Sequence, residues 1–231
     1  SVAWARSMNI LGQTILSAAN VIGVMKSTVE FPDIPYLEAI DDIVAIGGVL
    51  DTETLLAAYA RGIFPWPQVG YPMLWFCPQK RGILDFSDLH IPKSLSKFIR
   101  QSGERYRFTV NTNFSKVIES CQLQKRPNQQ GTWILPEIKK AYMQFHRDGY
   151  AHSVECWRDD ILVGGIYGVL VDGVFSGESM FHHEENVSKL SLLHLIDWLK
   201  AKNIQWMDIQ MITPVTEAFG GKYISAKDFF D

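Results

Sequence analysis

The stretch HSVECWRDDILVGGIYGVLVDGVFSGESMF, residues 152–181, decides the fold class. It contains three runs rich in β-branched, aromatic and other apolar residues, at 152–157, 161–171 and 173–181, and such runs are typical of strands. Only the polar residues 158–160 and the pair Asp172-Gly173 separate them, and segments this short join antiparallel neighbours. The stretch therefore predicts a three-stranded antiparallel meander.

Helical patterns surround this meander. Four segments have the apolar spacing of a helix, at 93–102, 114–124, 136–148 and 188–202. Residues 206–212, WMDIQMI, read as a further strand. A meander followed by a helix and a strand predicts an α+β fold with a mainly antiparallel sheet. The glycines within 161–171 fit bulges or close backbone approach better than a phosphate-binding loop.

The first third of the chain reads as a smaller unit. Asp51 is expected to cap a helix at its start, and Gly62 to end the same helix. A boundary at Pro78-Gln79-Lys80 predicts a small N-terminal domain over 31–79 and a larger domain over 80–231. Residues 1–30 are expected to be a leader or extension. Their Asn, Gln and Ser residues argue against a membrane span, and an export signal is the less favoured alternative.

The composition excludes several protein classes. With 47% hydrophobic and 20% charged residues among 231, the chain is globular rather than disordered. Cys77, Cys121 and Cys156 lie far apart, which argues against a disulfide framework or a structural zinc site and predicts a cytoplasmic protein. The adjacent His182 and His183 point to different sides in extended chain, so we expect no metal site. The sequence also lacks GxSxG and HExxH motifs.

The formal net charge of −3 conceals a basic centre. Residues 80–140 carry +7, between −4 for residues 1–79 and −6 for residues 141–231. Within the basic block, Lys93, Lys97 and Arg100 recur at helical spacing and would share one helix face. Such a face fits a nucleic-acid partner or a solvated surface equally well, so the charge alone favours neither.

Three polar residues stand inside apolar strand patterns. Glu178 is flanked by aromatic residues and methionine, and Asp208 and Gln210 lie two apart, on one face of a strand. Each buried polar group without a partner costs about 1–3 kcal/mol, so partners must exist. From these residues alone, an internal hydrogen-bond network is a better interpretation than a reaction centre.

A series of short motifs changes this balance. In chain order they are AIGGVL (45–50), LLAAYARGIFPW (55–66), MLWFCPQKR (73–81), GTWI (131–134), GYAHSVECW (149–157), LVGGIYGV (162–169), GESMF (177–181), NVSK (186–189) and DIQ (208–210). From about residue 31 to residue 231, the chain resembles the bacterial leucyl/phenylalanyl-tRNA–protein transferases.

This resemblance implies a small N-terminal domain followed by a larger domain like that of the GNAT acetyltransferases. It implies transfer of Leu, Phe or Met from aminoacyl-tRNA to proteins that begin with Arg or Lys. The product would carry an N-degron read by the bacterial Clp protease system. We expect a cytoplasmic monomer with no membrane partner and no cofactor, because the aminoacyl-tRNA is itself a substrate.

The resemblance also implies site residues. Trp66 and Trp133 match tryptophans at the aminoacyl-adenosine end, although core packing would equally explain them. Lys93, Lys97 and Arg100 match the basic cluster for the tRNA acceptor arm. The amino-acid pocket would be formed by apolar residues, namely Ile166, Phe175, Met180, Leu192 and Met207.

Glu178, Asp208 and Gln210 match the polar positions of the reaction centre. A carboxamide is too weakly basic to remove a proton by itself. The expected roles are that Gln210 accepts a hydrogen bond from the attacking amine, that Asp208 fixes it, and that Glu178 holds an amino group or a cationic side chain. Proton transfer through the tRNA ribose or a water is an open alternative.

The chain departs from the family pattern at a few positions. Val49 stands where the family has Asp, Phe76 replaces a tryptophan, and no histidine follows the DIQ motif. The last change bears on the loop near 213–221 and on acceptor handling.

Two other functions are considered. An acyl-CoA acetyltransferase would need a glycine-containing phosphate loop at a helix start, where this chain has the acidic HHEENVSK (182–189). A non-catalytic RNA-binding module would not need Glu178, Asp208 and Gln210.

Overall fold

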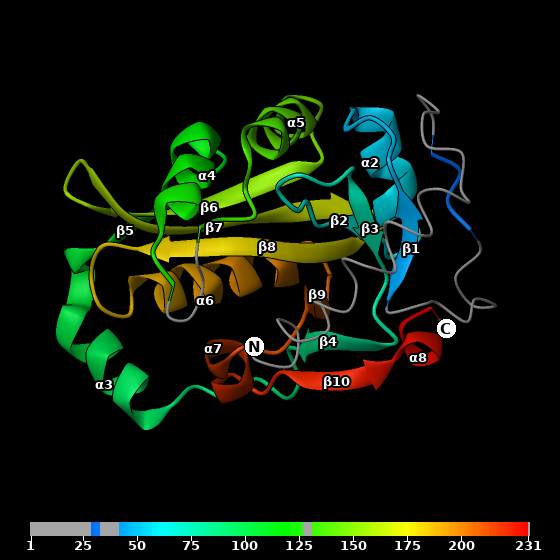
Figure 1. Cartoon of the computed structure of the whole chain (residues 1–231). Helices are drawn as coiled ribbons and strands as arrows, with labels where there is room; N and C mark the ends of the chain where they lie inside the picture. Colours follow the sequence, from blue (N-terminus) through cyan, green and yellow to red (C-terminus); the bar gives the residue numbers. More distant parts are fainter. Residues whose placement is uncertain (1–28, 33–41, 127–130, 231) are drawn as a thin grey trace.

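The structure is a computed structural model and describes residues 29–32, 42–126 and 131–230. Its main sheet has the strand order β10-β4-β9-β8-β7-β6-β5 (Figure 1). Neighbouring strands are antiparallel except for the parallel pair β8 and β9. The expected α+β class with a mainly antiparallel sheet is therefore confirmed. The strands of this sheet are β4 (Lys80–Asp85), β5 (Arg107–Val110), β6 (Ala151–Arg158), β7 (Ile161–Val171), β8 (Val174–His182), β9 (Trp206–Gln210) and β10 (Lys222–Ser225).

The predicted meander is formed by β6, β7 and β8. Val171 pairs with Val174, so the second turn consists of Asp172 and Gly173 alone. Both turn residues have positive φ values, 49° and 81°, a conformation that matches strand twist and that Gly and Asp tolerate. The second turn is thus as predicted, whereas the first is one residue shorter than predicted, because Arg158 already pairs with Ile161 across it.

Helices cover both faces of the main sheet (Figure 1). On one face lie α4 (Phe114–Leu123) and α5 (Pro136–Arg147), and on the other lies α6 (Val187–Lys200). Together with α3 (Lys93–Ser102), they confirm the four predicted helices to within two residues at each end. A short 3-10 turn (Gly103–Arg105) follows α3, and two short helices, α7 (Pro214–Ala218) and α8 (Ala226–Phe230), lie near the C-terminus.

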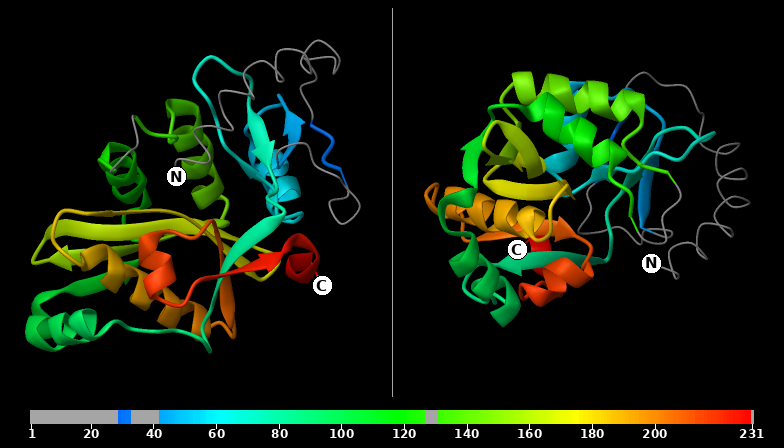
Figure 2. Two further views of the ribbon diagram at one scale, coloured as in Figure 1. Left: turned by 60° about the horizontal axis from the view of Figure 1, so that its bottom comes forward. Right: turned by 90° about the vertical axis from the view of Figure 1, so that its left-hand side faces the viewer.

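A second, smaller sheet has the order β1-β3-β2. Its strands are β1 (Ile43–Ile46), β2 (Phe64–Pro65) and β3 (Leu74–Phe76). This sheet and α3 lie at opposite ends of the molecule (Figures 1 and 2). The helix α2 (Thr52–Tyr59) lies beside the small sheet.

The start of α2 is capped as expected, because the Asp51 carboxylate accepts the backbone N–H of Thr54 at 2.8 Å. The expected end is wrong by two residues, since Ala60 is the C-cap. Gly62 closes the following turn with a φ of 63°. This left-handed residue lets the N–H of Ile63 donate back to the carbonyl of Ala58 at 2.9 Å.

The small sheet shares one hydrophobic cluster with the helices of the larger part. Leu55 and Trp75 from the N-terminal part belong to the same cluster of buried residues as Tyr142, Phe145 and Tyr167. A single cluster across Gln79 is compatible with a domain boundary there but does not require one, so the division into 31–79 and 80–231 stays a prediction. The expected leader, apart from its last two residues, lies outside the described residues.

Candidate active site

A β-bulge in β8 sets the position of Glu178. Tyr167 of β7 pairs with Ser179, whereas the next residue, Gly168, pairs with Gly177. Glu178 is therefore an extra residue on its strand, opposite no single partner. Such bulges re-aim a side chain and are common next to active sites.

Gly168 permits the bulge, because a Cβ atom there would lie 2.3 Å from the carbonyl oxygen of Ser176. The extra residue also reverses the alternation of side chains along β8. Phe175 belongs to the buried cluster under α6, whereas Phe181, an even number of residues later, belongs to the cluster on the other face.

Asp208 on β9 is fully buried and fully bonded. Nε and Nη2 of Arg81 donate to its two carboxylate oxygens at 2.8 and 2.6 Å. The hydroxyl of Ser176, its partner across the parallel pair, donates at 3.0 Å. The backbone N–H of Gln210 donates at 2.8 Å. The carboxylate is thus held on every side and cannot turn without breaking several bonds.

Arg81 is a site residue that the sequence does not predict, and Tyr59 is another. A buried Asp208 requires a partner, but Arg81 lies 127 positions away in the chain. The pairing of β4 with β9, which sets Ile83 opposite Asp208, brings the two together. Burial alone would lower the pKa of Arg81, but the charge and hydrogen bonds of Asp208 outweigh burial and raise this pKa above its usual value.

The predicted strand over 206–212 is two residues too long, because β9 ends at Gln210. Gln210 has a φ of 58°, which is uncommon outside glycine and turns the chain out of the sheet. Asp208 stabilises this turn by accepting the Gln210 N–H. The two side chains still face the same side of the sheet, since Asp208 contacts Ser176 and Gln210 contacts Glu178.

The Glu178 carboxyl group is hydrogen-bonded to residues of α2 and β9. Nε2 of Gln210 and the hydroxyl of Tyr59 donate to its Oε1 at 3.0 and 2.7 Å, and the hydroxyls of Tyr59 and Tyr142 are hydrogen-bonded to each other. Burial raises the pKa of Glu178 to about 8; the Tyr59 hydrogen bond opposes this rise and the nearby Asp208 charge adds to it. Glu178 can therefore gain or lose a proton near neutral pH.

Trp66 and Trp133, far apart in the chain, stack on each other with ring centroids 5.6 Å apart and planes 13° apart. Both rings are partly exposed and pack against the first hydrophobic cluster. Nε2 of Gln122 holds the segment after Trp133 by donating to the carbonyl of Ile134 at 2.7 Å. The pair thus forms an aromatic surface with one side on the core.

The five predicted pocket residues come together in the hydrophobic cluster between the sheet and α6. Four of them are almost completely buried, and Met180 is partly buried at the margin of the cluster. They arrive from four elements, so their convergence results from the fold. The residues of this set are Ile166, Phe175, Met180, Leu192 and Met207.

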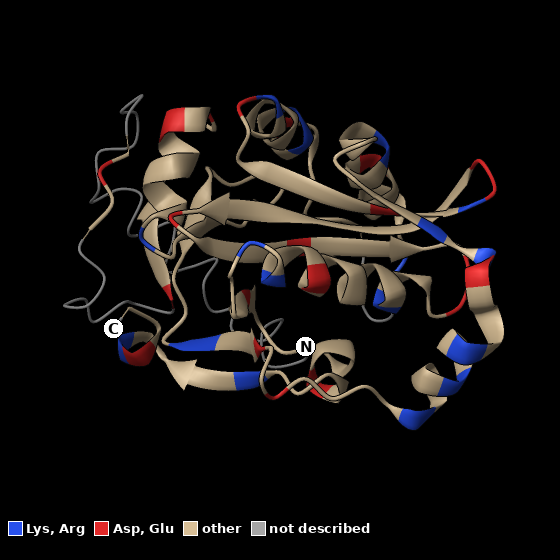
Figure 3. Cartoon of the chain, turned by 180° about the vertical axis from the view of Figure 1, so that it is seen from behind, with Lys and Arg blue, Asp and Glu red and all other residues tan. Residues whose placement is uncertain are grey.

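The predicted basic face lies on α3, whose ribbon is coloured blue at several places along its length in Figure 3. Lys93, Lys97 and Arg100 are all exposed, and Leu95 is buried on the side of the helix toward the protein. None of the three basic residues forms an ion pair with the described residues. Their charges are therefore available to an external anion.

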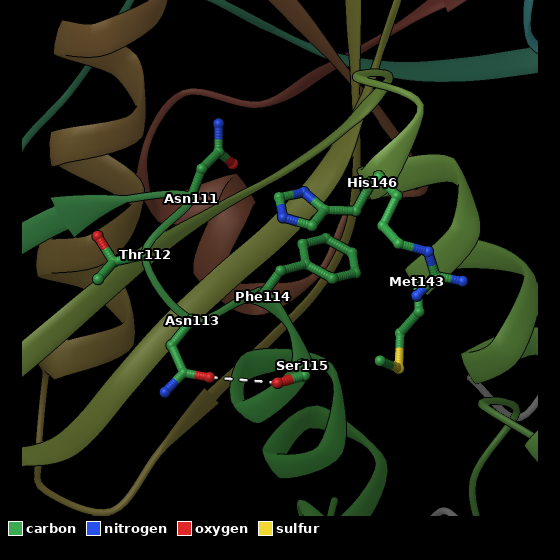
Figure 4. A pocket seen from close by; sticks show the side chains of 8 residues that line it. Asn111, Thr112, Asn113, Phe114, Ser115, Met143 and His146 are labelled. Atoms are coloured by element: carbon green, nitrogen blue, oxygen red, sulfur yellow. Dashed lines mark hydrogen bonds between the residues drawn. The ribbon is translucent and has the colours of Figure 1, made fainter.

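A pocket of about 250 Å³ lies elsewhere, between the start of α4 and the end of α5 (Figure 4). The ring of His146 stacks on Phe114 there, with centroids 4.3 Å apart. The fully buried Glu155 accepts the N–H groups of Thr112 and Asn113 at 3.3 Å each. None of the predicted site residues lines this pocket; its lining consists of Asn111, Thr112, Asn113, Phe114, Ser115, Met143, His146 and Arg147.

The acidic segment before α6 (182–186) forms contacts within the protein. Glu184 accepts a hydrogen bond from Tyr106 at 2.8 Å and pairs with Arg158 at 2.9 Å. Among the described residues, no three His, Cys, Asp or Glu side chains are grouped as metal ligands. None of the helices in the described part of the chain is long and apolar enough to span a bilayer.

Comparison with known proteins decides the family. The model of the leucyl/phenylalanyl-tRNA protein transferase family matches residues 83–231, and the model of its N-terminal domain matches residues 48–79. The chain belongs to this family. It is accordingly an aminoacyltransferase, and the family transfers aminoacyl groups from tRNA to proteins.

Transferases of this family in several bacteria are similar to the chain over most of their length. The one from Anaeromyxobacter sp. (strain K) is 42% identical over 199 residues, which cover 86% of this chain and 84% of that protein. The one from Pseudoalteromonas translucida is 41% identical over 202 residues, covering 87% and 84%. For Flavobacterium johnsoniae the values are 42% over 196 residues, covering 84% and 92%.

Solved structures give more distant similarities. L-PGS from Bacillus licheniformis has a TM-score of 0.43 and 11% identity, covering 75% of this chain and 63% of that one. A ribosomal-protein-alanine N-acetyltransferase from Brucella melitensis has a TM-score of 0.28 and 19% identity, covering 43% and 74%. Scores this low do not establish a shared fold, so the GNAT-like fold stays a prediction.

Proposed function

We propose that this aminoacyltransferase moves Leu, Phe or Met from aminoacyl-tRNA to the N-terminal Arg or Lys of acceptor proteins. The product would carry an N-degron that directs it to proteolysis. Membership of the family supports the donor and acceptor classes. The single observation that carries the chemistry is the hydrogen-bonded set Glu178, Gln210 and Asp208 at the bulge of β8. The proposal includes a cytoplasmic monomer that needs no cofactor.

The reaction makes only modest chemical demands. The acceptor amine attacks the carbonyl carbon of the aminoacyl ester, a C–N bond forms, and the bond to the tRNA ribose oxygen breaks. The amine loses a proton and the ribose oxygen gains one. Because the ester is already activated, the main task is to position the two substrates, which is worth roughly 7–11 kcal/mol in well-oriented reactions.

Glu178 is the group best suited to handle the proton. An N-terminal amine has an ordinary pKa of about 7.7–8.0, close to the value of about 8 to which burial raises the pKa of Glu178. Proton exchange between groups of matched pKa requires little free energy. An arriving ammonium group can thus pass its proton to ionised Glu178 and become the free base that attacks.

Gln210 and Asp208 would then orient the amine. Gln210 points its amide nitrogen at Glu178, which leaves its carbonyl oxygen to accept a hydrogen bond from the attacking amine. Asp208 acts through the backbone of Gln210 rather than by touching its side chain. The acidic part of the chain after residue 140, with a charge of −6, favours acceptors that begin with Arg or Lys.

The donor would occupy the other surfaces. The partly exposed Trp66–Trp133 pair offers a ring face to the terminal adenosine, since stacking on an aromatic side chain contributes about 1–3 kcal/mol per base. The cluster around Met207 and Phe175 would open to admit a Leu, Phe or Met side chain, with Met180 as an adaptable wall. The basic face of α3 would bind phosphates of the acceptor arm.

One experiment separates this function from its rivals. The purified chain is incubated with radiolabelled leucyl-tRNA and a peptide that begins with Arg, with and without RNase. Labelling of the peptide that RNase abolishes supports the proposal. Labelling that depends on acetyl-CoA would support an acetyltransferase instead, and RNA binding without labelling would support a binding module.

Two variants test the assigned roles in the same assay. Glu178→Ala and Gln210→Ala should each lower the rate strongly while leaving the fold intact. Gln205→Ala serves as a matched control, because Gln205 is an exposed residue just before β9. Near-normal rates in the two site variants would remove Glu178 and Gln210 from the reaction.

A further inference from the structure

Arg81 is held more tightly than an ion pair alone requires. Its side chain is 2% exposed, and its Nε and Nη2 atoms donate to the two carboxylate oxygens of Asp208. Its Cζ also lies 4.9 Å from the ring centroid of Phe64 and 4.8 Å from that of Phe229. These rings come from β2 and α8, so a strand of the small sheet and the last described helix both contact one guanidinium group.

A series of hydrogen bonds connects the Arg81 guanidinium group to the reaction centre. Arg81 fixes both oxygens of Asp208, and Asp208 in turn accepts the backbone N–H of Gln210. That bond stabilises the left-handed turn at Gln210, whose φ is 58°. The turn decides where the Gln210 amide meets the Glu178 carboxyl, at 3.0 Å. Arg81 is therefore three contacts away from Glu178.

Stability is a poor explanation for this buried pair. Desolvation largely cancels the attraction in a buried ion pair, and apolar residues of similar volume often stabilise as well or better. Moreover, Nη1 of Arg81 is buried without a hydrogen-bond partner among the described residues, which is unfavourable in itself. The guanidinium group keeps one donor unsatisfied, and this cost is best explained if the geometry of its other two donors is needed.

We propose that Arg81 is a positioning residue of the transfer reaction, one that fixes Asp208 and thereby the turn that aims Gln210 at Glu178. It touches neither substrate. The inference rests on the proposed function, because it assumes that the amide of Gln210 orients the acceptor amine. The rings of Phe64 and Phe229 contact the guanidinium group and hold it in the orientation that binds both carboxylate oxygens of Asp208.

The decisive variant is Arg81→Lys, which keeps the charge but replaces a planar fork by a point charge. A misplacement of about 1 Å in a reacting group can reduce a rate about 100-fold. We therefore expect kcat for leucine transfer to an Arg-starting peptide to fall about 100-fold. KM for leucyl-tRNA should change less than about threefold, because tRNA binds on other surfaces. Arg61→Met, at an exposed arginine, is the control and should leave both constants unchanged.

A merely structural role would not move two further readouts. The amide hydrogen of Gln210 should exchange faster in Arg81→Lys than in the wild type, while amides of β6 and β7 exchange as before. In addition, Arg81→Lys combined with Asp208→Asn should be no slower than Asp208→Asn alone, because both changes remove one positioning device. Additive losses would overturn the proposal.

Phe229→Leu provides an independent arm, which keeps the ion pair and removes one of the two ring contacts. It should lower kcat several-fold at unchanged KM, and it decides the matter if Arg81→Lys proves unfolded by circular dichroism. Unchanged kcat in a folded Arg81→Lys protein, or in Phe229→Leu where only that variant folds, would overturn the proposal. Failure of the wild type to transfer leucine would instead overturn the proposed function, so the two failures are distinguishable.

Discussion

Replacing Glu178 by Gln should abolish a pH dependence of stability that the wild type shows. The pKa of Glu178 rises from 4.5 to about 8 on folding, chiefly because of burial. The folded state thus binds the proton more tightly than the unfolded state. This contribution to stability is fully present below pH 4.5 and is lost as the pH rises toward 8. Gln carries no titrating proton and keeps an oxygen that can accept the hydrogen bonds from Tyr59 and Gln210.

The size of the effect follows from the shift. Each pH unit between the two pKa values corresponds to about 1.4 kcal/mol, so the whole interval would be worth about 5 kcal/mol as an upper bound. Between pH 5 and pH 7 the fully buried value is about 2.7 kcal/mol. The side chain is partly exposed, so we expect about 2 kcal/mol after screening by solvent.

The assay is urea unfolding of the wild type and of Glu178→Gln at pH 5, 6 and 7. Other titrating groups act alike in both proteins and cancel in the difference between the two free energies of unfolding. That difference should change by about 2 kcal/mol across the range, in favour of the variant as the pH rises. For Glu104→Gln, at an exposed carboxylate, the plot of the free energy of unfolding against pH should instead run parallel to that of the wild type. Parallel curves for Glu178→Gln would refute the environment assigned to Glu178.

Three further predictions concern the substrate surfaces. Reversing the charge of Lys93 and Lys97 together with Glu should weaken tRNA binding and reduce the slope of log K against log salt by about 1–2, and an unchanged slope would exclude α3 from the tRNA site. Trp133→Ala should weaken binding of an aminoacyl-adenosine by about 1–3 kcal/mol in a titration while leaving the salt slope as it was. Met207→Ala, at a side chain 1% exposed, should lower the free energy of unfolding by about 2–4 kcal/mol and raise the preference for Phe over Leu, as measured in a competition assay.

Local patterns predicted the α+β class, the meander, β9 and the four long helices, but they did not predict β4, β5, β10 or the small sheet. The meander, the four long helices and the Asp51 cap depend on residues close together in sequence, where periodicity and turn chemistry decide the structure. Among the elements that were predicted, the errors lie at ends where a distant contact overrides local preference. Gln210 shows this well, since nothing in WMDIQMI marks the third residue from its end as left-handed. The turn becomes intelligible only with Asp208 already fixed by Arg81.

The reaction centre could be predicted only in part. Glu178, Asp208 and Gln210 stand out because polar residues in apolar strands need partners. Their partners Tyr59 and Arg81 do not stand out, since they lie 119 and 127 positions away in the chain. Arg81 is brought close by the pairing of β4 with β9, and Tyr59 comes from the end of α2. The bulge at Glu178 is likewise invisible locally, because the register between two strands depends on both.

The carboxyl groups of Asp208 and Glu178 influence each other electrostatically, and Arg81 makes their environments different. Asp208 has a guanidinium partner and four hydrogen bonds, which stabilise its negative charge. Glu178 has neutral donors only, and the Asp208 charge adds to the burial that raises its pKa. The Arg81 charge opposes this rise, so without it the pKa of Glu178 would move further above that of an attacking amine. Arg81 therefore bears on the proton as well as on geometry, because its positive charge limits how far burial raises the pKa of Glu178.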